Sequence, residues 1–375
     1  MPLNANFSLD SIENLSIFKT NPKLLQRLKL NTSDDSFYET HQLYKTIHFR
    51  CITNELVDES IDLIYNGIVY FTIKKQLHCI YDLSKLFIET LKKSPSKVVP
   101  ESIDADFVSK CKFIHASLKE GIEEQNEFTA GILKWSGNLF AQQAAQIKSI
   151  THENALIVYQ KNFGHVDLNR AFALNLWLEK NYVKARYHFL HSTDADSFSQ
   201  MMIECHHNYG FPSEVELFLT QVVLQLLCLR NLKTAVDFFN HYVKHHSQID
   251  ADTQPLVNFL NFLFSAIKLK RVSIFNTLLD VYKPSLDRDK SYYDFLDRIG
   301  QYFFNLKPKK VEKESMFGNL MRMLTTPSTS LPQQDNQSSN DNNTKYNNKQ
   351  LEDEDDEDEW NSFKEDDIKD NDILD

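Results

Sequence analysis

The sequence predicts an all-α protein, built as an α-solenoid of stacked, divergent hairpins of the tetratricopeptide type. Apolar residues recur at three- and four-residue spacing almost throughout residues 11–325, without a convincing run of strict alternation. This is the period of helices rather than of strands. Glycine and proline are scarce, at 8 and 10 residues among 375, whereas a sheet protein with many tight turns needs glycine for positive φ.

A short pattern recurs along the predicted helices and supports the solenoid. An apolar helix is followed by a short polar turn and a large apolar residue, and the residue three positions after it begins a second apolar helix. Copies of the pattern start at Tyr182, Leu232 and Val272, with earlier ones at Phe37 and Leu77 and a weaker one near Phe128. Intervals of 40 to 54 residues between these copies favour a divergent array of helical hairpins, because one hairpin cannot bury its apolar face alone.

Charge divides the chain into a body and a tail. The net charge is −11, but residues 351–375 hold 14 acidic residues and two lysines, so the rest of the chain carries only +1. Such a body has no basic excess with which to bind nucleic acid. Residues 326–350 contain almost no aliphatic side chain. We therefore expect a flexible N-terminus over 1–10, a solenoid over 11–325 and a disordered tail over 326–375.

The acidic tail also contains a candidate binding motif. Trp360, Phe363 and Ile368 recur at roughly helical spacing, and such a segment can dock in a groove of a partner. The alternative is a solubilising tail with incidental aromatic residues.

Cysteine usage and hydropathy predict a soluble protein of the cytosol or nucleus. Five cysteines occur without a C-x-x-C motif, as in proteins with reduced, mostly buried thiols. The first 18 residues lack the basic and apolar regions of a secretory signal. The most apolar windows are shorter than the ~20 residues that cross a bilayer.

The segment 179–198 has the residue types of a metal or acid/base site. His188 and His191 are three residues apart and fall on neighbouring positions of a helix. Tyr182, Ala185 and Phe189 define the inward stripe of that helix, which places His188 at its margin and His191 further away. Asp194, with Ser192 and Thr193, is a candidate N-cap of the next helix, and Asp196 suits its first turn.

No other group of residues indicates catalysis. His241 and His245, and Cys205 with His206 and His207, lack further ligands at a known spacing. The sequence contains no phosphate-binding glycine loop and no nucleophile elbow. We expect no enzyme, metal or cofactor. The alternatives are a metal hydrolase that uses His188 and His191, and a scaffold subunit of a PCI-type complex. The PCI-type scaffold requires a β-containing winged helix after the solenoid, whereas the pattern of residues 285–325 predicts helices.

Seven strings, in this order, resemble the Golgi-to-ER traffic protein 4 family, which is also described as a subunit of the transmembrane-domain recognition complex. They occupy residues 37–50, 81–91, 133–136, 176–194, 213–231, 256–264 and 282–304. The resemblance implies a right-handed stack of helical hairpins and a cytosolic adaptor that targets tail-anchored membrane proteins to the ER. The N-terminal half, about 11–165, then docks on the targeting ATPase. The C-terminal half, about 166–325, holds a ubiquitin-like-domain protein, and in animals a BAG-domain chaperone scaffold joins the complex.

The resemblance also implies candidate site residues. Those for ATPase docking lie in the segment that matches the family's first hairpin: Tyr38, Glu39, His41, Gln42, Lys45 and Arg50. Those for the ubiquitin-like partner lie in the last hairpins and near the loop 245–255: Phe259, Phe262, Leu263, Tyr282, Leu286, Tyr293, Leu296, Ile299 and Phe303. Several of these nine must be core residues instead. The chain departs from the family pattern at Ser36 and Phe37, at Thr40, at Asn305 where glycine is common, and in its long tail.

Overall fold

The computed structural model describes residues 7–34, 36–93, 103–119, 121–147, 152–250 and 254–307. Every regular element in these ranges is a helix and none is a strand, which confirms the predicted all-α class. No helix in these ranges combines the length and the apolar character that a membrane span requires. The predicted tail, with Trp360, Phe363 and Ile368, lies outside the described residues, as do residues 1–6.

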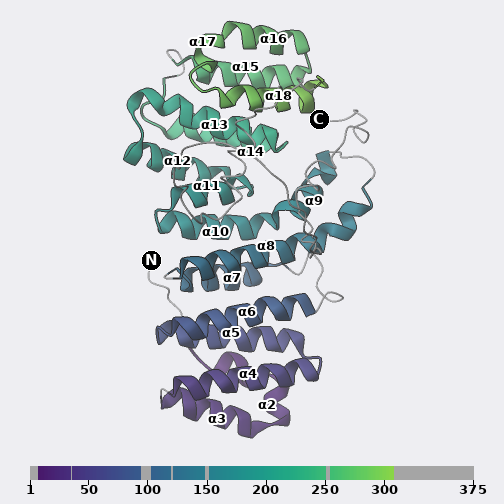
Figure 1. Ribbon diagram of the computed structural model, residues 1–375, viewed down its shortest axis with the longest axis vertical. Helices are drawn as coiled ribbons and strands as arrows, with labels where there is room; N and C mark the ends of the chain where they lie inside the picture. Colours follow the sequence, from purple (N-terminus) through teal and green to yellow (C-terminus); the bar gives the residue numbers. More distant parts are fainter. Residues whose placement is uncertain are drawn as a thin grey trace, which may run out of the picture.

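The helices stack along the long axis of the molecule, from α2–α4 at one end to α15–α18 at the other (Figure 1). The N-terminal helices are α1 (Asp10–Glu13), α2 (Ser16–Thr20), α3 (Pro22–Ser33), α4 (Phe37–Thr53), α5 (Val57–Ile73), α6 (Leu77–Lys93), α7 (Ala105–Ser117), α8 (Ile122–Ala145) and α9 (His152–Phe163). The remaining helices are α10 (Val166–Leu178), α11 (Tyr182–Leu190), α12 (Ala195–Tyr209), the short 3-10 helix η2 (Pro212–Glu214), α13 (Val215–Cys228), α14 (Leu232–His245), α15 (Pro255–Leu269), α16 (Val272–Val281), α17 (Lys283–Leu286) and α18 (Ser291–Phe304).

Five hairpin turns reverse the chain through one residue in the left-handed conformation. These residues have φ between 51° and 61° and are Glu55, Lys75, Lys180, Arg230 and Lys270. They follow α4, α5, α10, α13 and α15. Glycine is the usual residue at such a position because it lacks a Cβ. This chain uses charged residues there, which explains how it makes many tight helix reversals with so few glycines.

The hydrogen bonds of these turns repeat from hairpin to hairpin. At the end of α10, the Lys180 N–H donates to the Trp177 carbonyl and the Asn181 N–H to the Leu176 carbonyl, both at 2.9 Å. Two donations of this kind satisfy carbonyls that a helix end otherwise leaves unpaired. The Asn181 side chain then accepts from the Lys184 N–H and caps α11. Asn231 caps α14 in the same way, so one residue both ends a turn and starts the next helix.

The structure tests the predicted repeat positions. A second helix is found at five of the six positions, but it begins at the large apolar residue itself and not three residues later: Phe37, Leu77, Tyr182, Leu232 and Val272 are the first residues of α4, α6, α11, α14 and α16. The candidate near Phe128 is wrong, because Phe128 lies inside the uninterrupted helix α8. Asn305 follows α18 with φ 53°, and this left-handed conformation accounts for an asparagine at a position where glycine is common.

The apolar core forms two clusters that meet on α10. One extends from Ile12 to Phe172, and the other from Ala173 to Phe304. The helix α10 therefore contributes neighbouring residues to both clusters. The predicted halves, which divide at residue 165, meet close to this junction, and their separate binding roles stay predictions.

Glycine in the left-handed turns is expected to stabilise the fold. We predict that Lys75→Gly and Lys270→Gly each raise the free energy of unfolding by about 0.5–1 kcal/mol, because the strain of a Cβ at positive φ exceeds the added entropy of glycine in the unfolded chain. Lys268→Gly, in the last turn of α15, is the matched control and should lower it by about 1 kcal/mol. Urea unfolding followed by far-UV circular dichroism measures these differences. If all three variants were less stable than wild type, the positive φ at Lys75 and Lys270 would not strain these residues, and the prediction would be wrong.

Candidate protein-binding surfaces

Four of the six candidate residues on α4 are exposed to solvent. Tyr38 is 76% exposed, and Glu39, Gln42 and Arg50 are also exposed. The opposite face of α4 is buried through residues such as Leu43 and Ile47. The amphipathic pattern of α4 thus turns a polar and aromatic stripe outward, beside the parts of the helix that pack against α2, α3 and α5.

The other two candidates on α4, His41 and Lys45, are held against α6. His41 Nε2 lies 3.0 Å and Lys45 Nζ 2.7 Å from the same Asp82 carboxylate oxygen. The His41 side chain is only 13% exposed and packs edge-on against Phe71. Burial lowers the pKa of His41, although Asp82 opposes this shift. These two side chains connect α4 to α6, so they contribute to the shape of the surface more than to its accessible groups.

Sequence reasoning missed an exposed aromatic residue on the same stripe. Phe49 is 52% exposed and lies eleven residues after Tyr38, which is about 20° around a helix. The exposed Leu30 on α3 adds an apolar side chain to this end of the stack. The sequence does contain a signal for this residue, because the apolar period of the helix does not assign Phe49 to the core.

The nine candidates in the C-terminal half separate into two groups. Five of them are at most 2% exposed and belong to the core: Phe259, Leu263, Leu286, Leu296 and Ile299. The sequence analysis could not tell these from surface residues, because all nine follow the same helical period. Their burial removes them from any surface that the folded chain offers.

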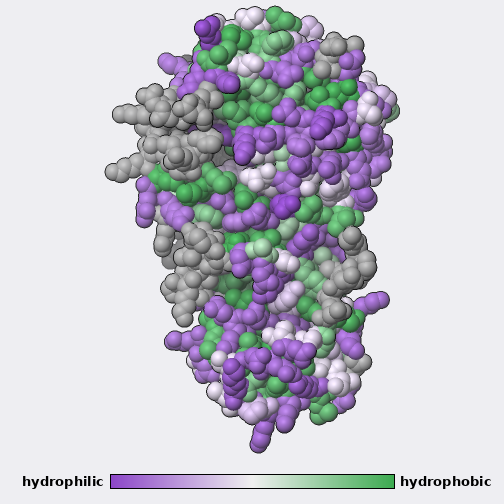
Figure 2. Space-filling view, turned by 180° about the vertical axis from the view of Figure 1, so that it is seen from behind, coloured by the Kyte–Doolittle hydropathy of each residue, from purple (hydrophilic) through white to green (hydrophobic). Residues whose placement is uncertain are grey.

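Four candidates remain accessible in the C-terminal half. Phe262 is 51% exposed, and Tyr282, Tyr293 and Phe303 are partly buried. The Tyr293 hydroxyl donates to Asp287 at 2.7 Å, which also pairs with Lys283. On the face seen in Figure 2, hydrophobic groups lie among hydrophilic ones toward the α15–α18 end.

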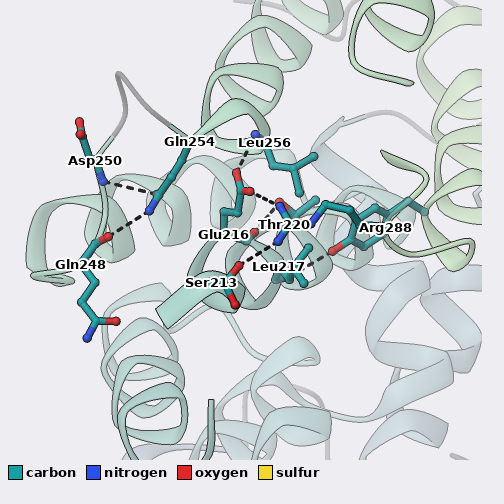
Figure 3. A network of polar contacts seen from close by, with 10 residues as sticks. Ser213, Glu216, Leu217, Thr220, Gln248, Asp250, Gln254, Leu256 and Arg288 are labelled. Atoms are coloured by element: carbon teal, nitrogen blue, oxygen red, sulfur yellow. Dashed lines mark hydrogen bonds and ion pairs between the residues drawn. The ribbon is translucent and has the colours of Figure 1, made fainter. Parts of the chain in front are cut away.

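A carboxylate on α13 joins three segments that carry this C-terminal surface (Figure 3). Glu216 accepts from the Leu256 N–H at 2.8 Å, at the start of α15. It also forms an ion pair with Arg288, which follows α17. Arg288 in turn donates to the Ser213 carbonyl at 2.8 Å. Glu216 is buried, and a buried carboxylate needs such partners. The sequence signal for this network was a single acidic residue within the apolar start of α13.

The loop between α14 and α15, which we expected near the partner surface, is anchored by side-chain contacts. Gln254 accepts from the Asp250 N–H at 3.4 Å and donates to the Gln248 carbonyl at 3.0 Å (Figure 3). The His246 ring lies 3.0 Å from the His206 ring nitrogen, and His206 Nε2 lies 2.9 Å from the Phe211 carbonyl oxygen. These contacts fix residues 246–250 to the α12–α13 connection.

The structure gives His188 and His191 packing roles. His188 Nδ1 lies 2.9 Å from Asn169 Oδ1, and burial lowers the pKa of His188 to about 4. We expected His191 away from the core, but it is buried because α9 covers it: Phe163 stacks on its ring at 4.1 Å and the Tyr159 hydroxyl lies 2.6 Å from its Nδ1. Burial lowers the pKa of His191 to about 3.

The remaining polar residues of this region also act locally. Asp194 accepts from the Ser197 N–H at 2.9 Å and caps α12, as the sequence predicts. His241 pairs with Asp196, and the His245 ring nitrogen lies 2.9 Å from the His241 carbonyl oxygen. Across the ranges that the structure describes, no group of three or more histidine, cysteine, aspartate or glutamate residues is placed to hold a metal ion.

The fold and its surfaces define a helical-repeat protein of the type that binds other proteins along an extended stack. The family described as Golgi to ER traffic protein 4 matches this chain over residues 54–325. The Golgi to ER traffic protein 4 homolog of Oryzias latipes is 34% identical over 302 residues, which cover 80% of this chain and 86% of that protein. The Homo sapiens homolog is 33% identical over 317 residues, 84% of this chain and 88% of its own length. The chain belongs to the Golgi to ER traffic protein 4 family.

A solved structure supports the fold. The crystal structure of C. therm. Get4 superposes with a TM-score of 0.64 and covers 82% of this chain and 96% of its own, at 15% sequence identity. The family assignment confirms the resemblance found in the sequence and fits a role in the guided entry of tail-anchored proteins. The family is one of traffic proteins and not a known enzyme family. The family match begins after α4, so the candidates Tyr38 to Arg50 precede it.

The Glu216 network should stabilise the C-terminal hairpins. We predict that Glu216→Ala lowers the free energy of unfolding by about 2–3 kcal/mol, since it leaves the Leu256 N–H without its acceptor and Arg288 without its ion-pair partner. Glu216→Gln keeps an acceptor for the N–H and should cost less. The exposed Asp280 on α16 gives the control, because Asp280→Ala should change stability by less than about 0.5 kcal/mol. Chemical unfolding measures all three, and equal losses for Glu216→Ala and Asp280→Ala would refute the role of the network.

The buried histidines should make the protein sensitive to acid. Burial lowers the pKa of His115 and His191 to about 3 and of His188 to about 4, below the ordinary value near 6.5. The unfolded chain therefore binds protons that the folded chain excludes. Stability is full above pH ~6.5 and falls as the pH drops toward 4, by up to about 1.4 kcal/mol per pH unit for each histidine. Unfolding measured from pH 7.5 to 5 checks this slope. His188→Gln should reduce it, whereas His245→Gln, at an exposed position, should not.

Proposed function

We propose that this chain is a cytosolic adaptor in the post-translational targeting of tail-anchored membrane proteins to the ER. It bridges a ubiquitin-like-domain protein, which works with chaperones, to the targeting ATPase. A BAG-domain chaperone scaffold is a further candidate partner. The observation that carries the proposal is membership of the Golgi to ER traffic protein 4 family over most of the chain.

The placement of exposed side chains supports an adaptor with two binding surfaces. The ATPase surface is proposed on α4, around Tyr38, Gln42 and Arg50, at one end of the stack. The surface for the ubiquitin-like partner is proposed around Phe262, Tyr293 and Phe303 in the last hairpins. The two surfaces lie in different halves of the stack (Figure 1), so one chain can bind two partners at once.

The alternative of a PCI-type scaffold receives no support from the described part of the C-terminal region. That alternative requires strands after the solenoid, and the chain forms the helices α17 and α18 between Lys283 and Phe304. No specific observation favours the metal hydrolase, since His188 and His191 bond to Asn169 and Tyr159 within the fold.

The direct test of the adaptor function is co-purification. The full chain is expressed with the targeting ATPase and with a ubiquitin-like-domain protein from the same source, and each pair and the three together are isolated through a tag on this chain. The proposal expects a ternary complex. Failure to retain either partner would refute it.

Variants of the two surfaces should separate the two partners. We predict that Tyr38→Ala combined with Arg50→Glu weakens ATPase binding at least about 30-fold, the effect of losing a hot spot of about 2 kcal/mol, and leaves the other partner bound. Phe262→Asp should do the converse. Titration calorimetry measures both affinities for each variant. His41→Ala, which removes a contact between α4 and α6, shows how much ATPase affinity is lost when the packing of α4 is disturbed. Parallel loss of both partners in either surface variant would indicate a folding defect and contradict separate surfaces.

A further inference from the structure

Three helices of the C-terminal half end at a common edge of the stack. Helices α13 and α15 pack together, and the Leu256 N–H at the start of α15 bonds to Glu216 at the start of α13, so the two run parallel. The end of α18 joins them, because Phe304 stacks on Phe275 in the first turn of α16 at 4.6 Å. The turns α13–α14 and α15–α16 and the end of α18 therefore lie side by side.

This edge carries a concentration of positive charge, here called the basic edge. It comprises Arg230 and Lys233 from the first turn and Lys268, Lys270 and Arg271 from the second. The turn segments 229–233 and 266–271 contain no acidic residue. Arg230 packs over the Tyr302 ring at 4.2 Å. Within the described ranges, the other four cations form no ion pair.

Helix dipoles explain only part of this charge. A cation near a helix C-terminus interacts favourably with the partial negative charge there, and the effect falls off within the last turn. At the corresponding position after α10, Lys180 is neutralised by Glu204. The basic edge lacks such carboxylate partners for four of its cations. It also exposes an apolar residue among them, since Leu269 is 58% exposed. The edge thus offers a surface that fits an acidic segment with an aromatic side chain.

The chain itself contains a segment of this chemistry. Residues 352–359 are all acidic and are followed by Trp360 and Phe363. Lys307, the last described residue, is placed at the edge by the reversal at Asn305, where the Leu306 N–H bonds back to the Gly300 carbonyl. Only 44 residues separate Lys307 from Glu352. A coil of that length spans about 33–40 Å, enough to reach the neighbouring turns, and such a tether gives an effective concentration on the order of millimolar.

We propose that residues 352–363 dock on the basic edge of the same chain. The acidic run lies against Lys233, Lys268, Lys270 and Arg271, and an aromatic residue after it covers Leu269. The contact is intramolecular and largely electrostatic, so it weakens as salt screens the charges. Any partner that approaches the α13–α16 turns must displace this segment. The proposal rests on the charges of this chain and is independent of the targeting function.

The contact can be mapped by zero-length carbodiimide cross-linking of the full-length protein, which joins carboxylates to lysines in direct contact. Mass spectrometry should find links from residues 352–359 to Lys233, Lys268 and Lys270 at about 50 mM salt, with their loss at about 500 mM. A mixture of isotope-labelled and unlabelled chains distinguishes links within one chain from links between two. Links spread evenly over the lysines of both halves, or links found only between chains, would overturn the proposal.

Small-angle scattering of variants tests whether the basic edge holds the tail. Wild type should have the smaller radius of gyration at low salt and expand at high salt. Lys268→Glu with Arg271→Glu should be expanded at both, while the matched control, Lys74→Glu with Lys75→Glu at the α5–α6 turn, should behave as wild type.

A variant of the tail alone distinguishes loss of the tail contact from misfolding of the Lys268→Glu, Arg271→Glu variant. Replacing the eight acidic residues of 352–359 by their amides leaves every described residue unchanged and should give the same expansion. A radius that does not depend on salt in wild type, or that is equal in wild type and in both test variants, would overturn the proposal.

Discussion

The architecture depends on the reversal of the chain after a helix by a residue in the left-handed conformation. The turn satisfies the last carbonyls of one helix and places the next helix antiparallel to it, so that each pair has one apolar face outward. Such a face must be covered by the following pair. Turn and stacking are therefore linked: the reversal creates the hairpin, and the need to bury its face aligns the hairpins over the two core clusters that meet on α10.

The same constraint separates the candidate binding residues into those that the packing of helices buries and those that it leaves exposed. Most apolar residues of α13 are buried against neighbouring helices, whereas Tyr38 and Phe49 of α4 remain exposed. Buried polar residues then secure the packing. Glu216 ties the start of α15 to α13, and Asp82 ties α4 to α6. The candidate surfaces therefore lie on helices of the stack, which position side chains more precisely than loops do.

Particular residues show how far the sequence can predict this site. The apolar period located α4, α11, α14 and α16 to within three residues, because turn chemistry and period agree there. It failed at Phe128, where a long helix carries the same local pattern without a break. The prediction for His191 was also wrong. Phe163 and Tyr159 of α9 cover the His191 ring, and the apolar pattern of α11 does not show that α9 packs there. Local periodicity contains no information about which remote segment covers a given position.

The sequence by itself determined the helical class, the positions of most hairpins, the family and the separation of a nearly neutral body from an acidic tail. These features depend on short-range periodicity, composition and strings of residues, which one chain displays directly. The tertiary structure alone decided which of nine similar apolar residues in the last hairpins are core. Phe262 and Leu263 are adjacent in the sequence, yet Phe262 is exposed and Leu263 is buried. It also decided that the turns after α13 and α15 share one edge. The reason is physical: exposure and the proximity of distant charges are set by the packing of helices far apart in sequence, and that packing exists only in the folded chain.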